Sequence, residues 1–289
     1  MTTQTLISTV TKTLLSTGAL AMALYSTSTF AQANTLSIKE KAEAIVTSIE
    51  TRDSAAIKHI NRRQFIQHNP AIEDGLVGFG TTWHMLPADT TKASVTRVIQ
   101  DDDFVITHGE YNYLGPKVGF EVFRFEEGKA VEHWDNFQKR QGNNASGRSQ
   151  TDGIAAITDL DKTDANKALV SDFVTTVLIG RDVDNINQFI GTAAADYLQH
   201  NPSMADGAVA VIAAVTADGT APSYQTNHKI LGEGNFVLAI SEGSFNSKPV
   251  AIYDLFRLDN GMIVEHWDTV EVIPATSKWA NDNGKFGFN

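Results

Sequence analysis

Histidine and carboxylate side chains that could transfer a proton recur in two blocks of the chain. The blocks are Glu132-His133-Trp134-Asp135 and Glu265-His266-Trp267-Asp268. In an extended strand, residues i and i+2 share one face, so each block presents a histidine and an aspartate together. A carboxylate in an apolar pocket has a raised pKa and can take a proton from a carbon next to a carbonyl group. A nearby imidazole can hold the oxygen of the resulting enolate, so this chemistry needs no cofactor.

A second pattern recurs at nearly the same spacing. The run Gln67-His68-Asn69-Pro70, followed by Asp74-Gly75, returns as Gln199-His200-Asn201-Pro202, followed by Asp206-Gly207. The offset is 132 residues here and 133 residues for the proton-transfer blocks. Two sets of identities in one order at nearly one offset indicate an internal duplication. The chain therefore contains two copies of one domain, copy 1 and copy 2.

Both copies open with the same helix signals. Apolar residues at helical spacing predict a first helix around 38–49 in copy 1 and around 169–177 in copy 2. A short second helix is expected after Asp53 and after Asp182. Each Asn-Pro pair places a good N-cap before a proline, so we expect a third helix to begin there.

After the helices the apolar period changes to two, which is typical of strands. The strands expected in copy 1 are 94–100, 104–111, 118–125 and 130–138. Those expected in copy 2 are 224–231, 236–245, 250–258 and 263–272. Helices followed by an antiparallel sheet make each copy an α+β domain.

The last hairpin of each copy decides which side chains meet. The segment Glu126-Glu127-Gly128 suits a type I turn closed by a left-handed glycine bulge. Counting back from this turn sets Glu121 opposite His133, with Phe123 and Asp135 on the same face. A two-residue turn would change these pairs. The corresponding face of copy 2 holds Asp254, Phe256, His266 and Asp268.

The combined pattern Q-H-N-P, D-G and D-x-F-R-x-x-x-G-x-x-x-E-H-W-D resembles bacterial SnoaL-like proteins of the nuclear transport factor 2-like (NTF2-like) superfamily. The resemblance covers both copies. It implies two tandem cone-shaped domains, each with about three N-terminal helices and a curved, mainly antiparallel sheet around a pocket. In the polyketide cyclases that name the family, an acidic residue at the end of this strand is the general acid/base. That role maps onto Asp135 and Asp268, but the cyclases have a histidine where this chain has Glu121 and Asp254.

The N-terminus reads as a secretory signal. Lys12 precedes an apolar run from Leu14 to Tyr25 and the A-x-A cleavage site Ala31-Gln32-Ala33. The run is too short to span a bilayer. We expect cleavage after Ala33 and a secreted or periplasmic protein, with an uncleaved anchor or a misplaced start site as the rival interpretation. The expected organisation is a signal peptide at 1–33, SnoaL-like copy 1 at 34–141, a linker at 142–163, and copy 2 with a C-terminal tail at 164–289.

Composition narrows the range of partners. The net charge of −11 argues against a nucleic-acid surface, and no membrane association is expected after signal removal. The chain has no cysteine, so thiol catalysis and thiolate metal sites are excluded. The resemblance implies pairing through the outer sheet face. The two copies could form such a pseudo-dimer within one chain, with Trp134 and Trp267 near the seam, and a homo-oligomer is a further option.

The residue patterns and the family resemblance together define two groups of candidate site residues. The candidate catalytic residues are Asp135, Asp268, His133, His266, Glu121 and Asp254. The candidate substrate-binding residues are His68, His200, Phe123, Phe256 and His108. No cofactor or metal is expected, because each His-x-Asp pair offers only two ligands. Simpler roles stay open: helix hydrogen bonds for His68 and His200, ion pairs for His133 and His266, and no shared role for His108, which Ile240 replaces in copy 2.

Two classes of function follow for a small-molecule ligand. The first is a cofactor-independent lyase, isomerase or aldol-type enzyme acting on a small carbonyl compound. The second is a non-catalytic periplasmic protein that binds a small apolar ligand. A protein-binding module is a third class that nothing in the sequence favours. Export argues against polyketide cyclisation, because carrier-bound chains are made in the cytosol. A polar-floored cavity would favour catalysis, a dry apolar one binding, and a filled one a scaffold.

Overall fold

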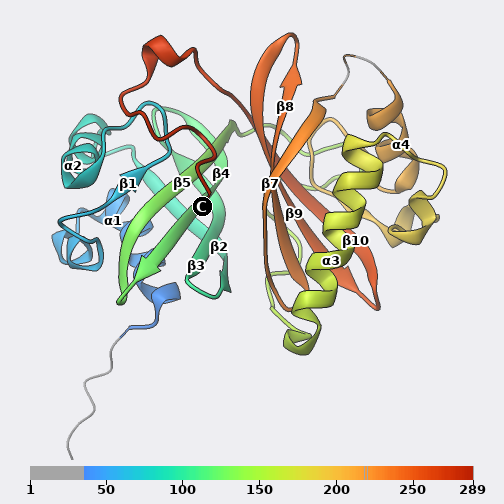
Figure 1. Cartoon of the computed structure of the whole chain (residues 1–289), viewed down its shortest axis with the longest axis horizontal. Helices are drawn as coiled ribbons and strands as arrows, with labels where there is room; N and C mark the ends of the chain where they lie inside the picture. The colour runs from blue at the N-terminus through green and yellow to red at the C-terminus, as the bar shows by residue number, and fades with distance from the viewer. Residues whose placement is uncertain (1–35, 218, 220, 289) are drawn as a thin grey trace, which may run out of the picture. The chain divides into compact units, whose positions relative to one another are not determined.

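Each copy folds as helices and one five-stranded sheet (Figure 1). Four strands of each sheet follow the helices, as the change of period predicts, whereas the short first strand precedes the last helix and was not predicted. The computed structural model describes residues 36–217, 219 and 221–288, so the expected signal peptide lies outside the described residues. The elements of copy 1 are α1 (Ile38–Thr51), η1 (Ser54–His59), β1 (Ile66–Gln67), α2 (Gly75–Met85), β2 (Lys92–Asp101), β3 (Phe104–Asn112), β4 (Pro116–Glu126) and β5 (Lys129–Lys139).

Copy 2 repeats this order with a more broken helical part. Its helical elements are η2 (Leu160–Lys162), α3 (Thr163–Phe173), the π-helical η3 (Val174–Ile179), η4 (Ile186–Gln188), η5 (Ala194–Asp196) and α4 (Ala208–Thr216). Its strands are β6 (Leu198–Gln199), β7 (Ser223–Glu233), β8 (Phe236–Phe245), β9 (Lys248–Asp259) and β10 (Met262–Val272), and the short η6 (Thr276–Lys278) follows them. Within the described part of the chain, no helix has the length and apolarity needed to cross a membrane.

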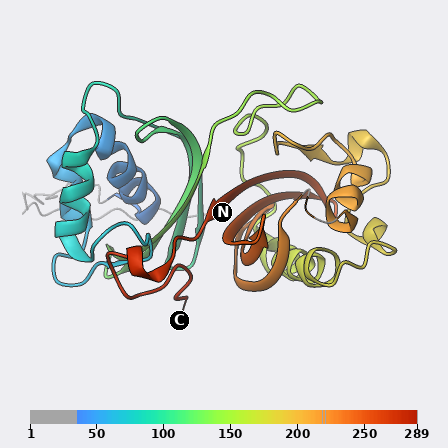
Figure 2. The same ribbon diagram turned by 90° about the horizontal axis from the view of Figure 1, so that it is seen from above.

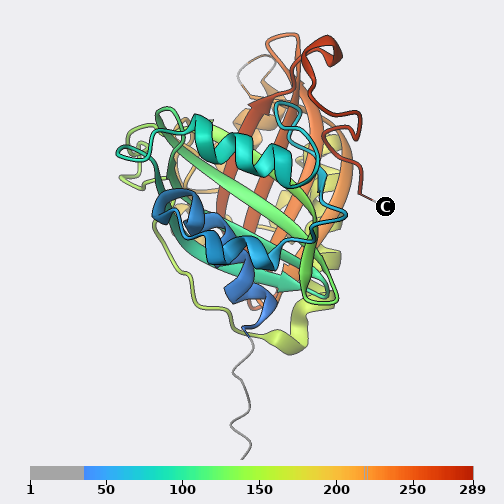
Figure 3. The same ribbon diagram turned by 90° about the vertical axis from the view of Figure 1, so that its left-hand side faces the viewer.

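The two sheets have the same topology. Their strand orders are β1-β5-β4-β3-β2 and β6-β10-β9-β8-β7, and only the short first strand of each runs parallel to its neighbour. In copy 1 the sheet curves around α1 and α2 (Figures 2 and 3). Ile45, Phe65 and Phe123 belong to the apolar core of copy 1, and Phe173 and Phe256 to that of copy 2. This α+β fold, with a curved sheet around helices, is the one that the sequence predicts.

The opposite faces of the two sheets share a third apolar cluster. It includes Trp134 and Trp267, which are both fully buried. The Asn136 side chain donates a hydrogen bond to the carbonyl oxygen of Ala251 in the other copy, at 3.0 Å. Both copies therefore fall within one compact unit, and the two tryptophans serve as packing residues.

The hairpin between β4 and β5 departs from the predicted turn. Glu126 pairs with Lys129 around two residues, Glu127 and Gly128, with φ values of 50° and 71°. Positive φ at both positions makes a type I′ turn. A two-residue turn alone would move one strand's side chains to the opposite face. The register shift that follows leaves Val131 as an extra residue, and this bulge restores the predicted face.

Because of this turn and bulge, the observed strand pairing differs from the predicted pairing by two residues. Glu121 lies opposite Asp135, not opposite His133, so the predicted face was right and the predicted pair was wrong. In copy 2, Asp254 lies opposite Asp268. Directly opposed residues have Cβ atoms about 5 Å apart. The two carboxyl groups of each copy are therefore immediate cross-strand neighbours.

The third helix starts later than the Asn-Pro pair predicts. The Asn69 side chain accepts the backbone N–H two residues on, at 2.8 Å, and closes a turn instead of a helix. The helix α2 begins at Gly75, after Asp74. The Asp74 carboxylate accepts the N–H of Gln67 at 2.8 Å, and the N–H of Gly75 donates to the Phe65 carbonyl at 2.8 Å. Gly75 has φ 73°, which favours glycine, so the Asp-Gly pair ties this loop back to β1.

The segments that follow the two sheets cross over to the other copy. In the linker, the Ser149 carbonyl accepts a hydrogen bond from Nδ1 of His200, next to β6, at 2.7 Å. In the tail, described as 281–288, the Gly284 carbonyl accepts from Nδ1 of His68, next to β1, at 2.7 Å. The linker thus covers the edge of copy 2, and the tail covers the edge of copy 1.

The linker and the tail also cover the two buried tryptophans. The indole N–H of Trp267 donates to the Asp152 carbonyl at 2.9 Å, and that of Trp134 donates to the Phe286 carbonyl at 3.0 Å. The Phe288 ring stacks on Trp134 with centroids 4.4 Å apart. Because a buried indole N–H needs an acceptor, these segments are part of the folded core.

Removal of residues 281–289 is expected to destabilise copy 1. Trp134 would lose the stacked Phe288 ring and its hydrogen-bond acceptor, at a cost of about 3 kcal/mol in the free energy of unfolding. Urea denaturation followed by tryptophan fluorescence measures the loss, with the exposed tail variant Asp282→Asn as control. An unchanged unfolding midpoint in the truncated protein would show that the tail does not belong to the folded unit.

Candidate active site

The parallel strand β1 aligns the Gln-His-Asn run with the Glu-His-Trp-Asp block. Gln67 lies beside His133, and its Oε1 accepts a hydrogen bond from His133 Nδ1 at 2.8 Å. Two residues on, Asn69 Nδ2 donates to Asp135 Oδ2 at 2.6 Å. Alternate side chains of one edge strand therefore hold alternate side chains of β5, which explains why the two runs recur together.

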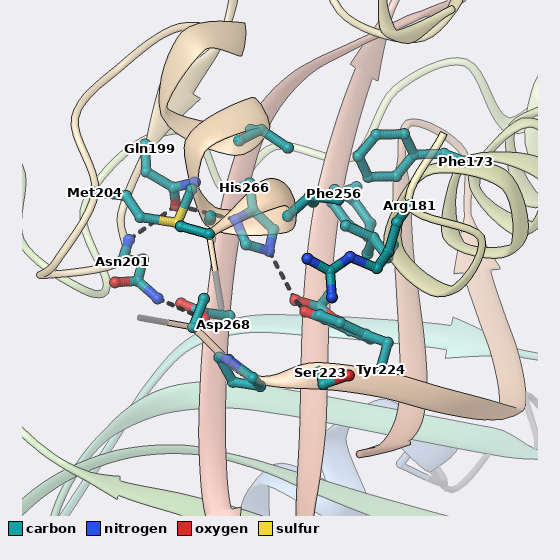
Figure 4. A pocket seen from close by; sticks show the side chains of 18 of the residues that line it. Phe173, Arg181, Gln199, Asn201, Met204, Ser223, Tyr224, Phe256, His266 and Asp268 are labelled. Carbon is teal, nitrogen blue, oxygen red and sulfur yellow. Dashed lines mark hydrogen bonds and ion pairs between the residues drawn. The ribbon is translucent and has the colours of Figure 1, made fainter. Parts of the chain in front are cut away.

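In copy 2, Gln199 and Asn201 make the same contacts with His266 and Asp268 (Figure 4). The opposed carboxyl group, Asp254, has partners of its own. Asp254 accepts hydrogen bonds from the Tyr224 hydroxyl, at 3.0 and 3.1 Å, and lies 3.0 Å from His266 Nε2. Across the hairpin, Asp268 Oδ2 accepts from Asn201 Nδ2 at 2.7 Å. Asp268 Oδ1 is buried and has no hydrogen-bond partner in the part of the chain that the structure describes.

The surroundings of Asp268 shift its titration toward neutral pH. Burial raises the pKa of Asp268 to about 6, and the charge of Asp254 acts in the same direction. Burial, aided by the charge of Asp254, also raises the pKa of Tyr224 well above its usual value, so the phenol stays a donor. One carboxyl group of the pair is thus held by donors, and the other can gain or lose a proton near neutral pH.

Gln199 fixes how His266 presents its protons. The amide oxygen of Gln199 accepts the backbone N–H groups of His200 and Asn201, at 3.0 and 2.9 Å, so the amide nitrogen cannot occupy that position. His266 Nδ1 lies 2.9 Å from this oxygen and must donate to it. The other ring nitrogen, Nε2, therefore faces Asp254 Oδ1 at 3.0 Å.

Copy 1 has the same contacts from the glutamine and the asparagine, but here the strand-end aspartate has the additional partner. Asp135 Oδ1 lies 3.3 Å from the ammonium of Lys285, which also lies 2.6 Å from Glu271. Glu121 lies 3.4 Å from His133 Nε2, and its Oε1 is buried with no hydrogen-bond partner among the described residues. Burial raises the pKa of Glu121, and the charge of Asp135 adds to this shift.

The predicted residues of the last hairpin meet at two cavities between helices and sheet. The cavity of copy 1 has a volume of about 480 Å³, and its lining includes Glu121, Phe123, His133 and Asp135. The cavity of copy 2 has a volume of about 100 Å³, and its lining includes Asp254, Phe256, His266 and Asp268. Across 36–217, 219 and 221–288, no three His, Asp or Glu side chains gather so as to hold a metal ion.

His68 and His200, which the sequence predicts to bind substrate, do not line these cavities. They follow Gln67 and Gln199 in extended chain, so their side chains lie on the opposite face. Their rings stack on Trp134 and Trp267 with centroids 4.6 Å apart in both copies. Their Nε2 atoms lie 2.8 Å from Glu132 and Glu265, whose guanidinium partners are Arg124 and Arg257.

His108, also predicted to bind substrate, does not line either cavity. Its ring stacks on Phe120 with centroids 4.3 Å apart, and its Nδ1 lies 3.2 Å from a nitrogen of Arg97. Burial, with the charge of Arg97, holds the pKa of His108 well below its usual value. His108 is therefore a neutral acceptor for a buried arginine.

Four kinds of site residue were missed. Gln67 and Asn69, with their counterparts in copy 2, carried a signal, because they recur in the same run at the same offset. Tyr224 stands outside the repeated blocks, and Lys285 lies in a polar tail far along the chain. Nothing in either segment indicated proximity to the aspartates.

Comparison with known proteins gives matches among solved structures only. No family model and no curated protein matches the chain. Similar structures include a candidate ketosteroid isomerase from Kribbella flavida (15% identity, 39% of this chain and 83% of that chain, TM-score 0.34). A second is an NTF2-like protein of unknown function from Cytophaga hutchinsonii (13% identity, 37% of this chain and 94% of that chain, TM-score 0.32). A third is an LEH-like epoxide hydrolase from M. tuberculosis (18% identity, 38% of this chain and 85% of that chain, TM-score 0.31). At these identities and scores, the activities in the names belong to those proteins alone.

Asp268→Asn is expected to stabilise the protein at pH 7.5. The folded-state pKa of Asp268 is raised from 3.8 to about 6, so its contribution to stability is full below about pH 4 and is lost as pH rises through 6. A neutral amide avoids this loss, which is on the order of 3 kcal/mol. Urea denaturation at pH 7.5 and at pH 4 should show a gain that disappears at the lower pH. The exposed Asp172→Asn on α3 is the control, and equal stability of D268N and wild type at pH 7.5 would contradict the titration.

Proposed function

We propose that the mature chain is an exported enzyme in which copy 2 transfers a proton on a small carbonyl compound, as an isomerase or lyase without a cofactor. The observation that supports this most is the Asp268 carboxyl group. One of its oxygens is held by Asn201, and the other is buried at the cavity with no partner among the described residues. The contact with Asn201 orients this carboxyl group, and its raised pKa suits a general base that works near neutral pH.

In the proposed reaction, Asp268 Oδ1 takes the proton from a carbon next to the carbonyl, and the bonding electrons move to the carbonyl oxygen as an enolate. The Tyr224 hydroxyl and His266 Nε2 contact Asp254 in the free protein, and in the proposed reaction they turn to the enolate oxygen as its hydrogen-bond donors. Return of the proton to another carbon completes an isomerisation. Loss of a leaving group from the neighbouring carbon completes a lyase reaction instead.

The cavity volume limits the substrate of copy 2. At about 100 Å³, this cavity is smaller than an apolar protein cavity of about 150 Å³ that holds benzene. The reacting part of the substrate should therefore contain only a few non-hydrogen atoms. Phe173, Val211 and Phe256 supply apolar walls beside the two aspartates.

Ligand binding without catalysis is the second candidate function, and the copy-1 cavity favours it. Its volume of about 480 Å³ falls in the range of pockets for drug-sized ligands. Ile45, Phe65 and Phe79 line it, and its Asp135 is already paired with Lys285. An apolar ligand would find a large cavity there whose strand-end carboxylate is neutralised.

Asp268→Asn is expected to lower proton transfer by about 10²-fold or more, because an amide cannot accept the proton. The measurement is exchange of deuterium from solvent into a panel of small ketones, followed by NMR. The wild-type rate should rise with pH and level off above about 6, since only the deprotonated carboxylate is a base. Equal exchange by D268N and wild type would remove Asp268 from the mechanism, and the exposed Asp172→Asn serves as control.

Export predicts a mature N-terminus at Asn34. Expression of the full chain in a bacterial host, followed by N-terminal sequencing of the periplasmic or secreted fraction, tests the cleavage site. The variant Ala33→Arg should block cleavage, because signal peptidase requires a small residue there. Recovery of an intact chain starting at Met1 in the cytoplasm alone would contradict export.

A further inference from the structure

A lysine from the tail lies between one carboxylate of each copy. Lys285 Nζ is 3.3 Å from Asp135 Oδ1 on β5 and 2.6 Å from Glu271 Oε2 on β10, and its side chain is 3% exposed. Burial by itself would lower the pKa of Lys285, but the charges of Glu271 and Asp135 raise it. Lys285 is therefore a buried ammonium with two carboxylate partners.

This contact satisfies both oxygens of Asp135. Oδ2 accepts from Asn69 at 2.6 Å, and Oδ1 faces Lys285. The opposed carboxyl group, Glu121, keeps one buried oxygen with no partner among the described residues. Copy 1 is thus the reverse of copy 2, where the strand-end Asp268 has the unpartnered oxygen and Asp254 is held by donors.

We propose that Lys285 and Glu271 complete the copy-1 site from outside that copy, and that Lys285 holds Asp135 as the anion so that Glu121 is the proton acceptor of copy 1. The inference rests on the proposed function in one respect, since it takes proton transfer to be the chemistry. Lys285 acts as a positioning residue through Asp135. Glu121 Oε1 accepts the proton from the substrate carbon, whose electrons pass to the carbonyl oxygen.

The other titratable groups near Glu121 and Asp135 are consistent with Glu121 as the proton acceptor. Tyr111 on β3 and Tyr113, which follows that strand, also face the pair, and burial with the charge of Glu121 raises the pKa of both phenols well above their usual value. They stay neutral and add no charge. His133 lies 3.4 Å from Glu121, and Lys117 lines the same cavity on the side of Glu271. Among these groups, Lys285 is the cation in contact with Asp135.

Residues from outside copy 1 form part of the wall of its cavity. Glu271 of copy 2 and Ala280, directly before the tail, belong to its lining together with Glu121 and Asp135. Its volume of about 480 Å³, against about 100 Å³ in copy 2, would admit a larger carbonyl compound. The two copies would then share one chemistry on substrates of different size.

The linker offers a matched substitution. Gly284 and Ser149 provide the same carbonyl contact to His68 and His200, and the residues that follow them are Lys285 and Gln150. Lys285→Gln therefore gives the tail the residue that the linker has, without a charge. Lys285→Arg keeps the charge and serves as the rescue variant.

The experiment follows side-chain carboxyl carbons by NMR between pH 4 and 8 in the full mature chain, without substrate. In the wild type, Glu121 is expected to titrate above its ordinary range while Asp135 has the signal of a carboxylate. In K285Q the titration step of Asp135 should move about one pH unit or more toward neutral. K285R should restore the wild-type pattern, and Asp268 in copy 2 should titrate alike in all three proteins.

Two results would overturn the inference: a wild-type protein in which Asp135 and not Glu121 carries the proton, or a K285Q protein in which Asp135 titrates as before. If K285Q does not fold, the wild-type titration and Glu271→Gln decide instead. E271Q leaves Lys285 on Asp135, so the proton should stay on Glu121. Because no substrate is involved, these outcomes are independent of whether D268N loses proton transfer in copy 2.

Discussion

Two carboxyl groups face each other across the last hairpin of each copy, and the rest of the site meets the demands of this pair. Both groups are buried, so ionising both at this distance is unfavourable. Each copy resolves the conflict by giving donors to one carboxyl group and leaving an oxygen of the other unpartnered among the described residues. In copy 2 Tyr224 and His266 hold Asp254. In copy 1 Asn69 and Lys285 hold Asp135.

The short edge strand of each copy contacts both the carboxyl pair and the core between the two sheets. Because β1 and β6 run parallel to the last strand, the glutamine and asparagine of each run reach the histidine and aspartate of each block. The histidine between them points the other way and stacks on a tryptophan of the shared core. One short strand thus connects the cavity face to the packing between sheets. A change in sheet packing would displace the cavity groups as well.

The sequence predicted the fold and one face of each site, and missed what long-range contacts decide. Period-two patterns located β4 and β5 within two residues, and strand parity placed Asp135 and Asp268 at the cavities. The pairing of Glu121 was missed, because a type I′ turn and a bulge at Val131 compensate each other in parity but not in register. Lys285 could not be predicted, since 150 residues separate it from Asp135 and only tertiary folding brings them together.

The linker packs on copy 2 and the tail packs on copy 1, and this explains how two copies with the same fold can have different sites. Each segment supplies a backbone carbonyl to the histidine of the other copy, and this contact does not depend on the side chains that follow. The next position is therefore free to differ. Gln150 accepts the backbone N–H of Gln141 at 2.7 Å, whereas Lys285 reaches Asp135 of copy 1. A single residue outside the sheet can then decide which carboxyl group of a copy is protonated, while the core and the hydrogen bonds of the edge strand stay unchanged.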